Sequence, residues 1–184
     1  TLKSTGLAEN TIIVFTSDHG DMLRSLGQQR KQRPYEESAR VPMLFHLPKS
    51  LEIASRRVQG TINTEDVMPT ILSLCNVPVP KTVEGLDFTG YLRGAADPSG
   101  GGAVVQCASP FGEFVRAQGG KEYRAVRTAR YTFARDLSGP WLLFDNQADP
   151  FQMTNLVGRP EHAALQAKLD AQLKAKRAAA HDEF

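Results

Sequence analysis

An aspartate and a histidine stand side by side directly after an apolar segment near the start of the chain. The segment, Thr11–Thr16, is rich in β-branched residues, and we expect it to form a buried strand. Asp18 and His19 follow it, and Gly20 then allows a sharp turn. A carboxylate and an imidazole at a strand end indicate two ligands of a divalent metal. The alternative is a capped loop whose histidine is satisfied by a protein partner.

The loop that follows this pair is basic. Its cations are Arg24, Arg30, Lys31 and Arg33, and Lys31 stands thirteen residues after Asp18. If a metal binds at the strand end, the metal and these cations would converge on an anion. The alternative is that the cations form a solvated face, as charge runs usually do.

The same residues belong to a longer pattern. The apolar segment is followed by T-S-D-H-G-D, then by Lys31, and then by Y-E-E-S-A-R-V-P over residues 35–42. This order closely resembles the C-terminal half of the catalytic domain of sulfatases, which belong to the alkaline phosphatase superfamily. The resemblance implies that Asp18 and His19 are ligands of a divalent metal and that Lys31 contacts the sulfate ester. It implies Ca²⁺ as the metal, with Mg²⁺ or Mn²⁺ as alternatives. Arg30 and Arg33 are then expected to be solvated neighbours of Lys31.

The sequence also departs from the family pattern. Many members have His-Gly a few positions before the lysine and Gly after it, whereas this chain has Leu26-Gly27 and Gln32. Sulfatases carry the motif C/S-x-P/A-x-R, whose Cys or Ser becomes the formylglycine nucleophile, and neither Cys75 nor Cys107 begins such a motif. The paired aspartates that supply the other metal ligands are missing too. We therefore expect the nucleophile and those ligands in the N-terminal half of the same catalytic domain, which is a partner this chain would require.

The elements that must position these residues indicate an α/β fold. Residues 1–95 are predicted to be the C-terminal part of an alkaline-phosphatase-like mixed sheet, and residues 96–184 a small antiparallel sheet with a terminal helix. In the first part we expect the tail of a helix that stops at Gly6, further strands over 43–47 and 58–62, and a helix from about residue 63 to Asn76. In the second part, after a flexible loop over 95–102, we expect strands over 103–107, 123–127, 131–135 and 141–144 and an amphipathic helix over 160–177.

Four further residues have reactive or charged side chains, but we expect structural rather than catalytic roles for them. Cys75 lies among apolar residues and is expected to be a small core residue. Asp66 and Glu84 are expected to be caps or turn residues rather than catalytic acids. Arg40 is expected to fix its loop by ion pairing with Glu36 and Glu37.

The composition limits the classes of partner that the chain is expected to bind. Its 22 Lys and Arg residues and 20 Asp and Glu residues give a net charge of +2, which argues against a nucleic-acid binder. We find no transmembrane segment, and the alanine-rich C-terminal helix is expected to pack on the protein rather than on a membrane surface. The expected ligand is a small anionic ester. The sequence begins at Thr1 without a signal peptide, and it leaves cytoplasmic, periplasmic and secreted locations, and the oligomeric state, open.

The resemblance implies metal-dependent hydrolysis of sulfate monoesters by a longer protein of which this chain is a part. Phosphonate monoester and phosphodiester hydrolases share the same pattern and form the first alternative. The second alternative is a truncated domain without catalysis. The alcohol portion of the substrate stays open, with aryl, sugar and choline-like groups all compatible, and the chain alone is expected to be inactive.

Overall fold

The computed structural model, which describes residues 1–184, divides into two compact units. The first unit comprises Thr1–Asp18 and Pro42–Gly101, and the second His19–Val41 and Gly102–Phe184. The last boundary between the units falls after Gly101, at the end of the predicted loop over 95–102. The first boundary separates Asp18 from His19, so the basic loop belongs to the same unit as the C-terminal sheet.

The first unit contains an antiparallel pair of strands, β1 (Ile13–Phe15) and β2 (Leu44–His46), in which Val14 lies opposite Phe45. Both strands were predicted, but the prediction that the first is buried is wrong within this chain. Ile13 and Phe15 expose 44% and 60% of their surface, and Leu44 exposes 59%. The apolar pattern is typical of a strand whose two faces are covered by other elements. A two-stranded ribbon alone cannot cover both faces.

The helix α2 (Thr64–Leu74) of the first unit begins with a capping box, in which the Asn63 backbone N–H donates to Asp66 Oδ2 at 2.8 Å. The Leu86 N–H donates to the other oxygen of Asp66 at 2.7 Å, which confirms a structural role for this carboxylate. The expected core position of Cys75 is wrong, because Cys75 is exposed. The buried face of α2 instead carries Asp66, Pro69, Thr70 and Leu74, and the Phe88 backbone N–H donates to Thr70 Oγ1 on this face at 3.0 Å.

The remaining elements of this unit are short. They are the 3₁₀ helices η1 (Ala8–Asn10) and η3 (Lys49–Leu51) and the helix α3 (Thr89–Leu92). The predicted strand over 58–62 is wrong: this stretch has no strand, and the Gly60 N–H instead donates to the Tyr91 hydroxyl at 2.9 Å. Residues 1–9 form turns and η1 rather than a helix tail, although Gly6 does adopt a positive φ of 74°.

The second unit is built on a four-stranded antiparallel sheet in the order β3-β4-β5-β6. Turns of a few residues join the last three strands, and all four were predicted. Their bounds are β3 (Ala103–Cys107), β4 (Tyr123–Arg127), β5 (Tyr131–Asp136) and β6 (Gly139–Asp145). Between β3 and β4 the chain forms two 3₁₀ helices, η4 (Gly112–Phe114) and η5 (Arg116–Gln118).

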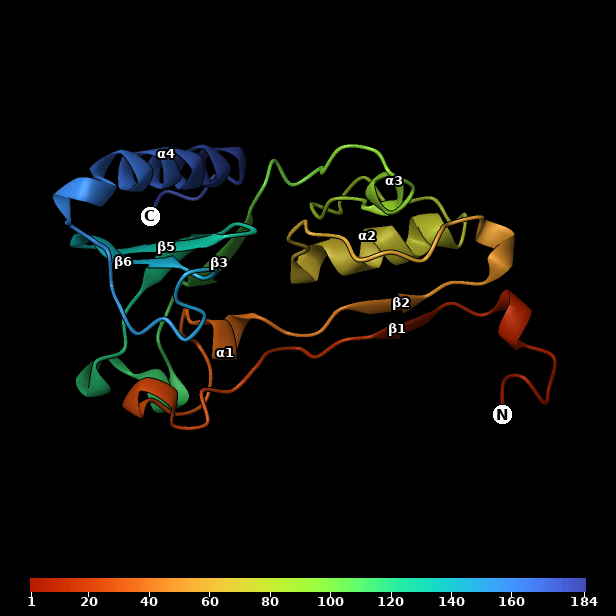
Figure 1. Ribbon diagram of the computed structural model, residues 1–184, viewed down its shortest axis with the longest axis horizontal. Helices are drawn as coiled ribbons and strands as arrows, with labels where there is room; N and C mark the ends of the chain where they lie inside the picture. Colours follow the sequence, from red (N-terminus) through yellow and green to blue (C-terminus); the bar gives the residue numbers. More distant parts are fainter. The chain divides into compact units, whose positions relative to one another are not determined.

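Each face of this sheet has its own core, because neighbouring residues of a strand point to opposite sides. Val126, Phe133 and Leu143 pack against Leu169 and Leu173 of α4 (Ala163–Ala179), which follows η6 (Pro160–His162) and lies along the sheet in Figure 1. The terminal helix therefore packs on the protein, as predicted. No helix of the chain combines the length and the apolar character needed to cross a membrane.

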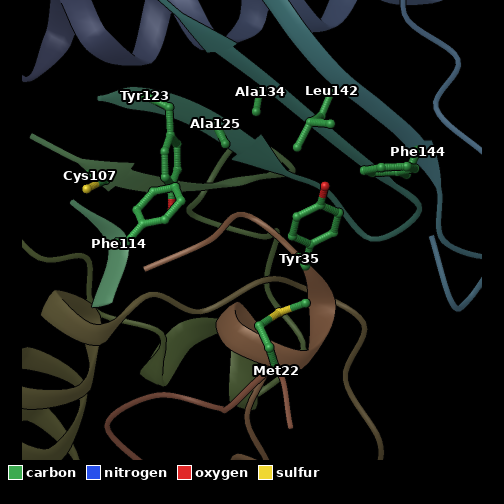
Figure 2. Close-up of a cluster of buried hydrophobic side chains, with 9 residues drawn as sticks. All are labelled: Met22, Tyr35, Cys107, Phe114, Tyr123, Ala125, Ala134, Leu142 and Phe144. Carbon is green, nitrogen blue, oxygen red and sulfur yellow. The ribbon is translucent and has the colours of Figure 1, made fainter. Parts of the chain in front are cut away.

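The other face of the sheet holds the basic loop (Figure 2). Met22 and Tyr35 of the loop approach the sheet from one side, and the strand residues face them from the other. Met22 is fully buried, and Tyr35 is 9% exposed. The helix α1 (Glu36–Ala39) directly follows Tyr35. The strand and η4 side chains of this cluster are Cys107, Phe114, Tyr123, Ala125, Ala134, Leu142 and Phe144.

Candidate functional site

Backbone hydrogen bonds connect the first residues of the loop over residues 19–41 to its later residues. The Gly20 N–H donates to the Ser38 carbonyl at 2.9 Å, and the Met22 N–H donates to the Arg30 carbonyl at 2.8 Å. A Cβ on Gly20 would lie 1.9 Å from the Glu37 carbonyl oxygen. Glycine is therefore needed at position 20 because the backbone of α1 approaches it closely. The sequence had indicated a different reason, a sharp turn.

His19 and Lys31 meet within this loop. Lys31 Nζ lies 2.8 Å from His19 Nε2, and His19 Nδ1 lies 2.7 Å from the Gly20 carbonyl oxygen. A carbonyl only accepts hydrogen bonds, so Nδ1 must carry the proton. Nε2 then presents its lone pair, to which the Lys31 ammonium donates. Two of the three residues singled out by the motif are thus in direct contact, and the imidazole has a defined tautomer.

This tautomer suits a metal ligand, because metal-binding histidines commonly donate their second ring N–H to a carbonyl. Asp18 offers an exposed carboxylate, whose Oδ1 accepts from the Ser17 hydroxyl at 3.3 Å. A neutral imidazole and a carboxylate fit a divalent cation as two of its ligands. The chain contains no group of three or more His, Cys, Asp or Glu side chains arranged to hold a metal. Asp18 and His19 are therefore candidates for part of a coordination shell.

The backbone on either side of Lys31 adopts a strained conformation. Its two neighbours, Arg30 and Gln32, both have positive φ values, 64° and 70°. Each such conformation in a residue with a side chain carries a strain of the order of 1 kcal/mol. The segment that presents Lys31 therefore needs compensating interactions from its surroundings.

Arg33 supplies these interactions, and the expectation that it is a solvated cation is wrong. It is only 8% exposed, and its Nη1 donates to the carbonyls of Gln29 at 2.7 Å and Lys31 at 2.8 Å. Its Nε donates to the Gln28 side chain, and its guanidinium carbon lies 4.5 Å from the centre of the Phe114 ring. A local charge pattern carries no information about Phe114, which lies about eighty residues away in sequence.

The other charges divide between solvent and structure. Arg24 and Arg30 are exposed, as solvated residues would be. The expected Arg40–Glu36 pair is present at 3.5 Å, but Arg40 is 74% exposed. Glu36 pairs mainly with Arg127, which contacts both carboxylate oxygens and ties α1 to β4. The residues lie 91 positions apart, so sequence spacing gave no signal for this pair.

A cavity of about 470 Å³ opens beside the loop, within the same compact unit. One wall comes from the loop and the other from η4, η5 and the residue after them. None of the residues of the second wall was singled out in the sequence. The lining residues are Gly27, Gln28, Gln29, Arg33, Glu113, Phe114, Gln118 and Gly119.

Comparison with known proteins identifies the family. Residues 27–179 match the family model described as N-sulphoglucosamine sulphohydrolase, C-terminal. The chain belongs to this sulfatase family. Over its whole length it is 40% identical to an ulvan-active sulfatase of Formosa agariphila, and it spans 36% of that protein.

Two solved structures extend the comparison to the fold of this family member. A 2-O GAG sulfatase superposes with a TM-score of 0.82 and 28% identity, over 99% of this chain and 39% of that one. A phosphonate monoester hydrolase of Silicibacter pomeroyi superposes with a TM-score of 0.74 and 28% identity, over 99% of this chain and 37% of that one. The resemblance to the C-terminal part of sulfatases and the mixed α/β fold class are thus confirmed. The chain spans little more than a third of the length of these relatives.

Proposed function

We propose that the protein to which this chain contributes is a metal-dependent hydrolase of sulfate monoesters, and that Asp18, His19 and Lys31 belong to its active site. The family membership and the sulfatase relatives support sulfate ester hydrolysis as the reaction class. The observation that carries the assignment of residues is the contact of 2.8 Å between Lys31 Nζ and His19 Nε2. It brings a cation and a potential metal ligand to one point.

In this proposal His19 and Asp18 hold the cation, Ca²⁺ in the first instance and Mg²⁺ or Mn²⁺ as alternatives. The metal would act as a Lewis acid that offsets charge on the nucleophile and the sulfuryl oxygens. The formylglycine nucleophile and the remaining ligands would come from the N-terminal half of the catalytic domain. Because Nδ1–H donates to the Gly20 carbonyl, His19 would hold the cation through Nε2 as a neutral imidazole.

Lys31 has a role that follows from its present partner. Its ammonium donates to the same Nε2 lone pair that a metal would use. If a metal were held at Nε2, the Lys31 ammonium would be available to donate to a sulfuryl or bridging oxygen of the ester. As a compact positive charge it would stabilise the negative charge that develops there.

The test is a comparison of rates with the complete enzyme. We expect 4-nitrophenyl sulfate to be hydrolysed with a kcat/KM above that for phenyl phosphonate esters and bis(4-nitrophenyl) phosphate. The first alternative, a phosphonate monoester or phosphodiester hydrolase, has specific support from the phosphonate monoester hydrolase that shares the fold. A preference for the phosphorus esters would favour that alternative, and turnover of none of them would favour a domain without catalysis.

The isolated 184-residue chain gives a second test. It offers two candidate metal ligands and no nucleophile motif, so we expect no turnover of 4-nitrophenyl sulfate above a blank with metal alone. Its binding of Ca²⁺ is expected to be weak for the same reason. Clear turnover by the purified chain would contradict the assignment of the nucleophile to another part of the domain.

A further inference from the structure

Two successive residues of the loop, Gln32 and Arg33, contact the segment that leads into η4. The Gln32 side-chain amide binds both polar groups of the Phe111 backbone. Its Nε2 donates to the Phe111 carbonyl at 3.2 Å, and the Phe111 N–H donates to its Oε1 at 3.4 Å. The Arg33 guanidinium lies over the ring of Phe114, which belongs to the core cluster of Figure 2. The segment that carries Lys31 is therefore attached to a part of the chain 79 residues away, and that part is anchored in the core.

Gln32 has a backbone conformation that disfavours a side chain. Its φ of 70° lies in the left-handed region, which glycine adopts without strain and residues with a Cβ do not. The sequence also departs from the family pattern at this position, where many members have glycine. The two hydrogen bonds to Phe111 offset the strain, and glycine could not make them. The side chain of Gln32 thus has a use that its local conformation alone does not explain.

The other hydrogen bonds around Lys31 stay within the loop. The Met22 N–H donates to the Arg30 carbonyl at 2.8 Å, and Arg33 Nη1 donates to the Lys31 carbonyl at 2.8 Å. These bonds fix the internal shape of the loop. The Gln32 amide differs from them because it joins the loop to another segment, directly beside Lys31 in the sequence.

We propose that Gln32 is a positioning residue for Lys31, and that its contact with Phe111 holds the backbone from which the Lys31 ammonium reaches His19. The inference rests on the proposed function, because Lys31 is the residue that it positions. Gln32 acts through Lys31 and needs no contact with the substrate. Loss of the side-chain amide should therefore lower turnover even where the fold is not weakened.

Two substitutions in the complete enzyme separate the contact from the strain. Gln32→Ala removes the amide and keeps a Cβ at the left-handed position, whereas Gln32→Gly removes both the amide and the strain. Both variants lack the contact with Phe111, and they differ in stability. The matched control is Glu52→Gly. Glu52 is exposed, has a φ of 53° and belongs to the other compact unit, so its replacement relieves similar strain and leaves the Gln32 contact intact.

We expect kcat for 4-nitrophenyl sulfate to fall about fivefold in both Gln32 variants, with the metal content unchanged. The melting temperature of Gln32→Gly should lie about 1–2 °C above that of Gln32→Ala. Glu52→Gly should keep kcat within about twofold of the unmodified enzyme. A kcat that recovers in Gln32→Gly together with stability would overturn the proposal, because Gln32 would then act on stability alone. A kcat unchanged in both Gln32 variants would overturn it too.

Hydrogen exchange tests the same contact without any hydrolysis. The Phe111 N–H donates to Gln32, and the Met22 N–H donates to the carbonyl of Arg30, the residue before Lys31. We expect both amides to exchange faster in both Gln32 variants and not in Glu52→Gly. Faster exchange at Phe111 with no change at Met22 would overturn the proposal, because the amide would then hold only the Phe111 segment. An enzyme that hydrolyses no sulfate ester but shows the expected exchange would refute the proposed function and leave Gln32 as the residue that holds the Lys31 segment.

Discussion

Replacement of Arg33 by Met is expected to lower turnover by removing the support of the Lys31 segment. Arg33 donates to two backbone carbonyls and one side-chain amide and packs on Phe114. Hydrogen bonds from a charged group contribute about 1.5–3 kcal/mol each, and the cation–π contact about 0.5–2 kcal/mol. The cost of burying the guanidinium offsets much of this sum. A net loss of about 2–4 kcal/mol is comparable with the strain of the two positive-φ residues beside Lys31, about 2 kcal/mol in total.

The segment would then leave its present conformation for much of the time, and Lys31 with it. We expect kcat for 4-nitrophenyl sulfate to fall by about tenfold or more in Arg33→Met, with a smaller fall in Arg33→Lys, which keeps the charge but lacks the planar fork. Arg30→Met is the control, since Arg30 is an exposed cation three positions away, and it should change kcat by less than twofold.

Three measurements decide the outcome. They are kcat and KM in the complete enzyme, the free energy of unfolding in urea, and hydrogen exchange at the amides of Lys31 and Gln32. Faster exchange at these amides together with a lower kcat would support a positioning role. A loss of unfolding free energy with kcat and exchange unchanged would show that Arg33 acts on stability alone and would refute the reasoning.

Two further predictions concern stability. Gly20→Ala should destabilise the chain by about 3 kcal/mol or more in urea unfolding, because the new Cβ would lie 1.9 Å from the Glu37 carbonyl; a change below about 1 kcal/mol would contradict the close approach. The hydrogen bonds from the Arg124 guanidinium hold the pKa of Asp182 below its ordinary value. The stabilisation by this pair should therefore be complete above about pH 4 and be lost as the pH falls through the lowered pKa. Asp182→Asn should cost about 2 kcal/mol at pH 7 and progressively less in acid, and a cost independent of pH would contradict it.

The C-terminal sheet could be predicted from the sequence because its signals are local. Short runs rich in β-branched and aromatic residues predicted four strands within residues 103–145, and β3 to β6 follow these runs closely. The stripe of Leu165, Leu169 and Leu173 likewise predicted α4, and Leu169 and Leu173 are buried. In both cases the residues that define an element also supply its packing surface.

Features that depend on distant parts of the chain could not be predicted. The charge of Arg33 suggested a side chain exposed to solvent. Its guanidinium is instead buried against Phe114 and donates to three acceptors of its own loop. Cys75 is exposed, whereas Thr70, on the buried face of α2, accepts a hydrogen bond from the backbone N–H of Phe88, eighteen residues further along the chain. The assignment of Asp18, His19 and Lys31 came from the family pattern. Their spacing alone would not have placed Lys31 on His19, and their roles stay predictions.

The most direct test of the proposed active site is the activity of Lys31→Ala in the complete enzyme, measured together with bound metal. If Lys31 contacts the sulfuryl group, kcat for 4-nitrophenyl sulfate should fall by about 10²–10³ while the metal content stays unchanged, and Lys31→Arg should restore little. Arg30→Ala should leave kcat nearly unchanged. A loss in Lys31→Ala no larger than that in Arg30→Ala, with the metal retained, would contradict the account and remove Lys31 from the site.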